Sequence, residues 1–406
     1  MTETEKSDRR PARVSRQGFL RLSGPASVGW LLSACRKAST RQPSPIPQTS
    51  EASPVRPSPE AGGNGSLGTV FLSDQRLRTL RQRIADRVEP TFSAFWKIRQ
   101  VAASRTNYQP HVPETWYVPG YYRDAQGHTT SKRGLQEDAN LAYTFALHYR
   151  MTDEVRSAEA AARLIDAWAG LQNLRTEDDS KLSFSYHFPA LILAADLIVG
   201  FDGWPAERQE AFRTFVRKKA LPMNTMDRAN NWGNWGLVLV LASAAWLGDA
   251  TWFGRGVDRW EAFIEHQIAE DGHLAHEVHR NNGVGERGIW YTHFSLMPQT
   301  IAAEIARVNG VDLYDYVAPN GRTLRLAYER VVPWARDPST FPYFQGEDKS
   351  ELKGTDYVSY FEILNPRWPN EDAMAMLAQR RPLMANHCTP HLTFTHGDLL
   401  HDDGTT

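Results

Sequence analysis

The 406-residue sequence lacks three features, and each lack excludes a broad class of protein. It has only two cysteines, Cys35 and Cys388, so a single disulfide is conceivable but a disulfide framework is excluded. Its formal net charge of -1 gives no electrostatic footprint for nucleic acid or for an anionic membrane surface, although a local basic cleft fits within a neutral total. Strand-like alternation of apolar and polar residues is scarce, which argues against a β-sheet protein.

The N-terminal 68 residues have the composition of an export signal followed by a tether. In residues 1–35 a basic start, "DRRPARVSRQGFLR", precedes an apolar stretch that is too short to span a bilayer. The ending Leu32-Ser33-Ala34-Cys35 resembles a bacterial lipobox, in which the cysteine is lipidated; an ordinary disordered N-terminus is the alternative. Residues 36–68 are rich in Pro, Ser and Gly and predict a disordered tether. We expect an exported bacterial lipoprotein, periplasmic or on the cell surface, that contacts the membrane only through Cys35.

Residues 69–406 predict one all-α domain. Ser73 is a candidate N-cap, and Leu77, Leu80 and Ile84 follow it at helical spacing. Further helices are expected in successive pairs, with a break near Thr152-Asp153, over residues 135–153 and 157–172, 188–201 and 205–222, 234–249 and 251–269, and 297–310 and 321–337. Antiparallel helical hairpins in series favour an incomplete (α/α) toroid.

The segment "RANNWGNWG", residues 228–236, is unusual at the start of an apolar helix. Asn230 and Asn231 bring side-chain amides to a helix N-terminus, where an anion is already favoured. Trp232 and Trp235 offer ring faces that could stack on sugars. The alternative is a helix cap at Asn231 with both tryptophans in the core.

A second dense patch, residues 270–298, carries histidines, arginines and a tyrosine. Glycines and asparagines between Arg280 and Glu286 predict a loop, with a helix restarting near Gly288. On that helix Arg287 and Tyr291 are four residues apart on one face, and a neighbouring cation would lower the pKa of the phenol and make it a usable base. His293 lies on another side of the helix, so its participation is less secure.

The same patch contains "HLAHEVH", which superficially suggests zinc. His276 and His279 are three apart, the glutamate directly follows the first histidine, and no cysteine pair joins them, so this is not the HExxH pattern. We therefore expect no metal and no other cofactor. His276, His279 and Arg280 are candidate substrate-binding residues.

Amides, Arg, Tyr and His without a carboxylate pair fit β-elimination at a uronate. The proton at C5 is alpha to a carboxylate, and its removal builds negative charge that hydrogen-bond donors must neutralise, while a second proton goes to the departing O4. Hydrolysis would instead need paired carboxylates.

The motifs "ANNWGNWG", "DGHLAHEVHR", "ERGIWYTHFSLMPQTIAAEIARVNGVDLY" and "YFEILNPRWPN" resemble the alginate-lyase superfamily of polysaccharide lyases over about residues 115–385. The resemblance implies an incomplete α/α toroid that cleaves an anionic uronate polysaccharide, either alginate (polymannuronate) or glucuronan. It also implies that Asn231 neutralises the substrate carboxylate with Arg287, and that a Tyr acts as acid and base.

Two positions depart from the family pattern. Trp232 stands where the family has a His, and Phe294 stands where a gap-free match from Arg287 would place the catalytic Tyr, so Tyr291 is nominated instead. His293, His187 or His279 could replace the missing His. Lys132, in "TTSKRG", resembles a substrate-binding basic residue, with a solvated surface Lys as the alternative.

Two other functions stay open. A glycoside hydrolase on the same fold would need an acidic pair from Asp271, Glu277 and Glu286. A non-catalytic glycan-binding lipoprotein would keep the aromatic cleft and lose the base.

Overall fold

The computed structural model describes residues 69–280, 283–352, 354–355 and 357–397. The predicted signal, Cys35 and the tether lie outside these residues. The described chain holds fourteen α-helices and one pair of two-residue strands. The helices are α1 (Asp74–Ala85), α2 (Thr91–Ser104), α3 (Ala125–Thr152), α4 (Val155–Ala169), α5 (Ser180–His187), α6 (Pro189–Ile198), α7 (Ala206–Phe215), α8 (Asn231–Leu247), α9 (Ala250–Gln267), α10 (Gly288–Val308), α11 (Leu324–Arg336), α12 (Phe361–Arg367), α13 (Glu371–Arg380) and α14 (Leu392–His396).

The strands β1 (Thr115–Trp116) and β2 (Asn173–Leu174) pair in parallel. A π-helical turn, Val216–Ala220, continues α7. None of the helices in the described residues is both long and apolar enough to cross a bilayer.

Helix boundaries follow local sequence signals. The Ser73 hydroxyl accepts the Arg76 backbone N–H at 3.1 Å and caps α1, as predicted. The break after α3 falls at Asp153, whose φ of 58° reverses the chain, and α8 ends at Gly248 with a φ of 70°. Both breaks produce the predicted hairpins, α3 with α4 and α8 with α9.

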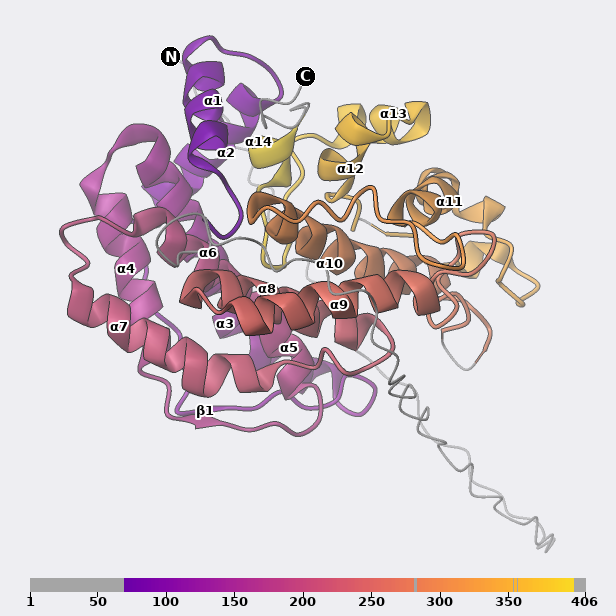
Figure 1. Ribbon diagram of the computed structural model, residues 1–406, viewed down its shortest axis with the longest axis horizontal. Helices are drawn as coiled ribbons and strands as arrows, with labels where there is room; N and C mark the ends of the chain where they lie inside the picture. The colour runs from indigo at the N-terminus through magenta and orange to yellow at the C-terminus, as the bar shows by residue number, and fades with distance from the viewer. Residues whose placement is uncertain (1–68, 281–282, 353, 356, 398–406) are drawn as a thin grey trace, which may run out of the picture. The chain divides into compact units, whose positions relative to one another are not determined.

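The helices form an inner and an outer layer. The helices α6, α8 and α10 are buried around almost their whole surface, whereas α9 and α11 bury one face each. Helix α4 packs on α3, α9 on α8 and α11 on α10, and Figure 1 shows α8, α9 and α10 side by side. One expected pairing differs: α7 packs against α4 and not mainly against α6, because α6 is enclosed by α3, α4 and α8.

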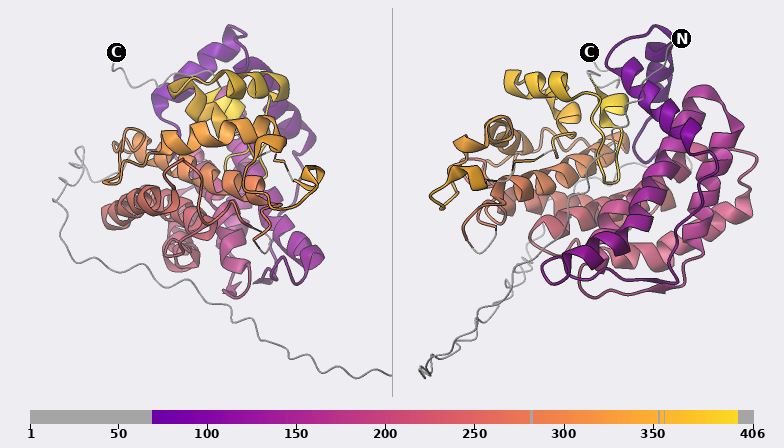
Figure 2. Two further views of the ribbon diagram at one scale, coloured as in Figure 1. Left: turned by 90° about the vertical axis from the view of Figure 1, so that its right-hand side faces the viewer. Right: turned by 180° about the vertical axis from the view of Figure 1, so that it is seen from behind.

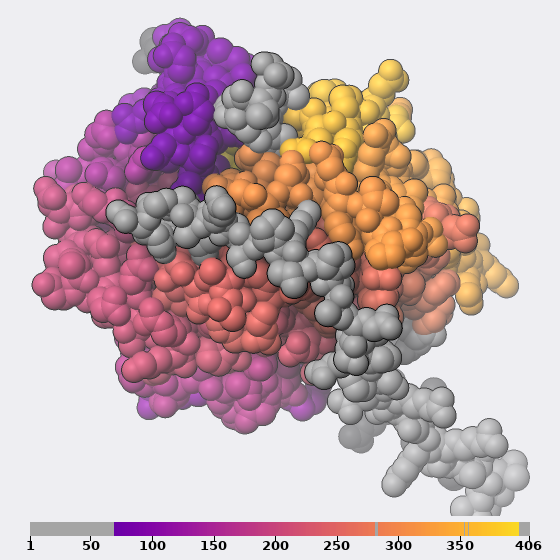
Figure 3. Space-filling model, viewed as in Figure 1, coloured from indigo at the N-terminus to yellow at the C-terminus, as the bar shows by residue number. Residues whose placement is uncertain are grey.

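The chain's halves occupy different sides of this assembly (Figure 2, right), with residues up to about α7 in indigo to magenta and α10 to α14 in orange to yellow. The two ends of the described chain nevertheless meet, since α14 packs on α1 and α2 and the Phe71 ring lies 5.1 Å from His396. Figure 3 shows the indigo and yellow ends at the same edge of the molecule.

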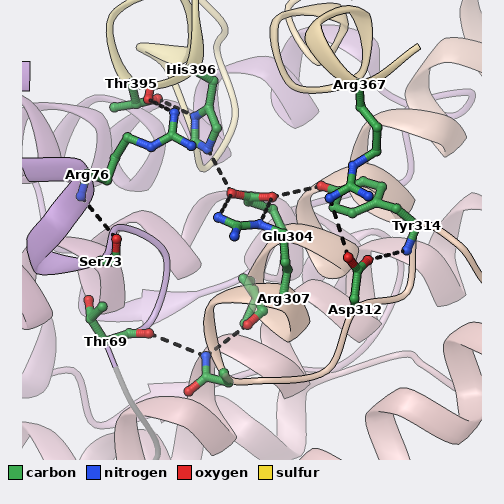
Figure 4. Close-up of polar contacts among 12 residues, drawn as sticks. Thr69, Ser73, Arg76, Glu304, Arg307, Asp312, Tyr314, Arg367, Thr395 and His396 are labelled. Carbon is green, nitrogen blue, oxygen red and sulfur yellow. Dashed lines mark hydrogen bonds and ion pairs between the residues drawn. The ribbon is translucent and has the colours of Figure 1, made fainter. Parts of the chain in front are cut away.

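A buried ion cluster joins these ends to the C-terminal half of α10 (Figure 4). The Glu304 carboxylate accepts two bonds from Arg307, at 2.9 and 3.1 Å, and one from the Tyr314 hydroxyl at 2.9 Å. His396 Nε2 lies 3.2 Å from the same carboxylate. Glu304 is therefore fully satisfied although only 1% of its surface is exposed.

Candidate active site

The candidate site lies at the first turns of α8 and α10, two helices that pack against each other. Asn234 Nδ2 on α8 donates to Ser295 Oγ on α10 at 2.6 Å, and the Trp235 ring is 5.4 Å from the Phe294 ring. The N-terminal part of α8 therefore lies beside the N-terminal half of α10. The loop 269–287 between α9 and α10 supplies the remaining groups.

The glycines of "NNWGNWG" allow the preceding chain to cross the first turn of α8. A Cβ on Gly233 would lie 1.9 Å from the Arg228 carbonyl oxygen, and one on Gly236 would lie 2.5 Å from the Thr225 and Met226 nitrogens. The Asn230 side chain accepts the Trp232 N–H at 3.1 Å and caps the helix. The cap is thus Asn230, and Asn231 is free for another partner.

That partner is Glu277. The Asn231 backbone N–H donates to Glu277 Oε1 at 2.8 Å, and Asn231 Nδ2 donates to both carboxylate oxygens at 3.0 and 3.1 Å. Arg280 Nε lies 3.4 Å from Oε2. Burial raises the pKa of Glu277 to about 7, against the opposing effects of Arg280 and of the Asn231 hydrogen bonds. Near neutral pH this carboxyl therefore carries a partial charge.

Arg280 connects Glu277 to the tyrosine. Its guanidinium lies 4.2 Å from the centre of the Tyr291 ring, and the Tyr291 hydroxyl is 2.7 Å from the Tyr122 hydroxyl. Burial, followed by the hydrogen bond with Tyr122, raises the pKa of Tyr291. The predicted lowering of this pKa is wrong, because loss of water around a 9% exposed phenol outweighs the cations beside it.

Arg287 joins the same group from the other side. Its guanidinium lies 5.6 Å from the Tyr121 ring, and a hydrogen bond with Tyr121 raises its pKa. The segment Tyr121–Tyr122, just before α3, thus contacts both Arg287 and Tyr291. Asn231, Arg280, Arg287 and Tyr291, all nominated from sequence, lie in one connected set.

A second cluster lies one helical turn below, around Phe294. Lys132 Nζ donates to the Tyr186 hydroxyl at 3.3 Å, so Lys132 is half-buried and is not a solvated surface residue. The Tyr186 ring is 5.8 Å from Phe294, and the His387 ring is 5.5 Å from it. Hydroxyl and imidazole groups therefore surround Phe294, the position at which the sequence resemblance predicts a tyrosine.

His187 stacks on His387 in this cluster, with ring centres 5.7 Å apart. Both ring nitrogens of His187 are buried without a hydrogen-bond partner among the described residues. Burial lowers the pKa of His387 to about 3 and that of His187 well below its ordinary value. Both imidazoles are neutral, and at 1% exposure His187 cannot touch a polymer in this conformation.

Two other nominated residues, His293 and Trp235, differ in position from the expectation, and three do not. His293 is fully buried and its Nδ1 is bonded to the Tyr360 hydroxyl at 2.9 Å, so it faces away from the site. Trp235 has no exposed surface and cannot stack on a sugar ring, whereas Trp232 is half-buried with Arg228 5.1 Å from its ring. His276 and His279 are exposed on the loop. Within the described ranges no group of three or more His, Cys, Asp or Glu could hold a metal ion.

Sequence reasoning missed Tyr122, Tyr186 and His387, and gave Glu277 a different role. Tyr122 and His387 lie outside the two dense motifs, and nothing in their local pattern links them to α10. Of these residues, Glu277 alone could have been assigned from sequence, because it is an acidic residue between His276 and Arg280 in the patch of residues 270–298.

Comparison with known proteins identifies the family and the fold of this chain. A family model described as alginate lyase matches residues 85–341. A curated polysaccharide lyase of Stenotrophomonas maltophilia (strain K279a) is 28% identical over 274 residues, which is 61% of this chain and 78% of that protein. An alginate lyase of Pseudomonas fluorescens is 30% identical over 139 residues, so the match spans only 35% of that protein.

The crystal structure of alginate lyase A1-III from Sphingomonas species A1 superposes with a TM-score of 0.65 at 18% identity, covering 80% of this chain and 97% of that chain. This likeness confirms the predicted α/α toroid.

Proposed function

The chain belongs to the alginate lyase family of polysaccharide lyases, and we propose that it cleaves a polymer of uronic acids, such as polymannuronate or glucuronan, by β-elimination. One observation carries the proposal. Asn231, Glu277, Arg280, Tyr291 and Tyr122 form an unbroken series of contacts at the first turns of α8 and α10. Amide, guanidinium and phenol groups in one place meet the demands of this reaction.

Two guanidinium groups are suited to neutralise the substrate carboxylate. Arg280 and Arg287 are half-buried and held over the rings of Tyr291 and Tyr121, so their charges are fixed in position before substrate binds. As the C5–H bond breaks, charge moves onto the carboxylate, and preorganised donors stabilise it. Asn231 has a supporting part, since its Nδ2 already donates to Glu277.

Tyr291 is suited to act as the general acid. Its raised pKa keeps the phenol protonated near neutral pH, so it can give a proton to O4 as the C4–O4 bond breaks. The C5 proton then needs another acceptor. Of the three histidines nominated to replace the missing family His, His187 and His293 are buried and His279 is exposed, so we assign the base to His279.

The hydrolase alternative has less support. Glu277 is fixed by Asn231 and Arg280, and Asp271 is paired with His273 and Arg330. An acid and a base facing each other across a glycosidic bond would need carboxylates free for the substrate.

The test is an absorbance assay for unsaturated uronate. The full chain is incubated with alginate, polymannuronate, polyguluronate and glucuronan, and we expect new absorbance with at least one of them. Tyr291→Phe keeps the ring under Arg280 but removes the proton, and should lower turnover by about 10²–10⁴-fold. Tyr122→Phe breaks the same hydrogen bond from the other side and should cost less than about tenfold.

Three other results would contradict the proposal. Reducing ends without absorbance would indicate a hydrolase, and binding without either signal would indicate a glycan-binding protein. Turnover near the wild-type value in Tyr291→Phe would rule out Tyr291 as the general acid.

A further inference from the structure

We propose that Asp179 is a positioning residue for the elimination reaction and acts through the backbone of Tyr121. It holds the pair Tyr121–Tyr122 in contact with Arg287 and Tyr291. The inference rests on the proposed function, because it explains what keeps those two groups in place. Asp179 lies outside the segments 228–236 and 270–298 that carry most of the site, directly before α5.

Tyr121 and Tyr122 are the central residues of a tight turn that leads into α3. The Gly120 carbonyl accepts the backbone N–H groups of Arg123 and Asp124, both at 3.0 Å, and the Asp124 side chain caps α3. The two tyrosine side chains are 36% and 69% exposed, and their ring centres are 5.5 Å apart. Because exposed side chains gain little from packing, the place of this turn depends on its hydrogen bonds.

Asp179 supplies a hydrogen bond to this turn from a distant segment of the chain. Its Oδ2 accepts the Tyr121 backbone N–H at 2.8 Å, and its own backbone N–H donates to the Val118 carbonyl at 3.1 Å. His128, at the start of α3, places Nε2 3.4 Å from the same Oδ2, and its ring centre is 5.5 Å from that of Tyr121. Asp179 is half-buried and His128 is buried, so the carboxylate is held between the turn and α3.

The turn held in this way contacts the candidate site at two points. The Arg287 guanidinium lies 5.6 Å from the Tyr121 ring centre and is hydrogen-bonded to Tyr121. The Tyr122 hydroxyl lies 2.7 Å from the Tyr291 hydroxyl. One backbone hydrogen bond, at Asp179, therefore fixes two side chains that touch the cation and the general acid of the proposed reaction. A displacement of about 1 Å in such groups can cost about 10²-fold in rate.

The adjacent carboxylate, Asp178, offers a matched comparison. Its Oδ2 accepts the Tyr117 hydroxyl at 2.5 Å and Arg123 Nη2 at 2.6 Å. Within the described residues neither Tyr117 nor Arg123 has a hydrogen bond with Arg287 or Tyr291. Asp178 and Asp179 thus hold the same stretch of chain, and Asp179 alone of the two bonds to the residue that contacts Arg287.

The experiment measures kcat and KM of the full chain on the uronate polymer that the wild type cleaves fastest. Asp179→Ala removes the acceptor and should lower kcat by about 10–100-fold with KM changed less than about threefold, because the affected contacts act on the transition state. Tyr117→Phe is the matched control, since it breaks a hydrogen bond of the same stretch, and should leave both constants within about twofold of the wild type.

The conservative variant Asp179→Asn tests whether the hydrogen bond is what matters. Its amide oxygen can still accept the Tyr121 N–H. Burial lowers the pKa of His128 to about 4, so near neutral pH the imidazole is neutral and does not require a charged partner. We therefore expect kcat of Asp179→Asn within about threefold of the wild type. A purely structural role would instead lower the folded fraction, seen in thermal melts, and leave kcat per folded molecule unchanged.

A second variant is decisive if Asp179→Ala does not fold. Asp179→Glu keeps the charge but moves the acceptor by one methylene, and should lower kcat by about tenfold or more. Wild-type kcat in folded Asp179→Ala, or in Asp179→Glu where the alanine variant is unfolded, would overturn the positioning role. A loss in Asp179→Asn as large as that in Asp179→Ala would overturn it as well. Failure of the proposed function looks different, because the wild type would then make no unsaturated product from any of the polymers.

Discussion

Two buried glutamates, one before the start of α10 and one near its end, have pKa values that are shifted in opposite directions. Glu277, in the loop before the helix, and Glu304, near its end, are each 1% exposed. Burial raises the pKa of Glu277 to about 7. Burial also acts to raise the pKa of Glu304, but the hydrogen bond with His396 and the pairing with Arg307 hold it well below its ordinary value.

The difference lies in the partners. Glu304 has the bidentate Arg307, the Tyr314 hydroxyl and His396, which compensate its charge. Glu277 has the neutral amide of Asn231 and a single Arg280 contact at 3.4 Å. A fully compensated carboxylate serves structure, whereas a poorly compensated one remains able to change charge near neutral pH, which is typical of functional sites.

The largest expected effect is on stability at the compensated carboxylate. Glu304→Ala leaves Arg307 buried without its partner and should lower the free energy of unfolding by about 3–5 kcal/mol, measured by urea denaturation. Turnover per folded molecule should change little, because Glu304 lies 13 residues beyond Tyr291, about 20 Å along the helix. A stability loss below about 1 kcal/mol would show that the cluster adds nothing net.

An intermediate effect is expected at the poorly compensated carboxylate. Glu277→Gln removes an acceptor that orients Asn231 and Arg280, and should lower turnover by about 10²-fold with a small change in stability. The folded-state pKa of Glu277 is raised, so its contribution to stability is full below its ordinary value of 4.5 and is lost as pH rises through about 7.

Unfolding free energies between pH 5 and 8 should therefore fall with pH in the wild type, and less steeply in Glu277→Gln. The control is Glu304→Gln, in which the fall of the unfolding free energy between pH 5 and 8 that Glu277 causes should remain. An identical slope in the wild type and Glu277→Gln would contradict the raised pKa.

The smallest effect is expected at an exposed ion pair. Arg81 contacts Asp153 with two hydrogen bonds, at 2.7 and 2.9 Å, yet both side chains are largely solvated. Asp153→Asn should change the free energy of unfolding by less than about 1 kcal/mol, because water and salt screen the pair. Asn also accepts the positive φ of 58° at this position. If Asp153→Asn lowered the free energy of unfolding as much as Glu304→Ala does, buried and exposed ion pairs would contribute equally to stability, contrary to this prediction.

Much of the fold could be predicted from sequence because helix periodicity and caps are local. Ser73, Asp153 and Gly248 end or begin helices where their residue types predict it. The pairing of α6 with α7 was wrong, because the neighbours of a helix that is apolar on all sides cannot be read from its pattern.

The site was predictable only in part. The two motifs brought Asn231, Arg280, Arg287 and Tyr291 into consideration, and the packing of α8 against α10 brings them together. Tyr122 could not be found this way, because it reaches Tyr291 across 169 residues of sequence.

By itself the sequence determined the helices, their order and the two segments that carry the polar groups, since backbone hydrogen bonding and the spacing of apolar residues are settled within a few turns. The tertiary structure decided which carboxylate holds Asn231, that His293 and Trp235 face the core, and that the pKa of Tyr291 rises. These properties depend on burial and on charges from distant segments, and neither is set until the helices pack.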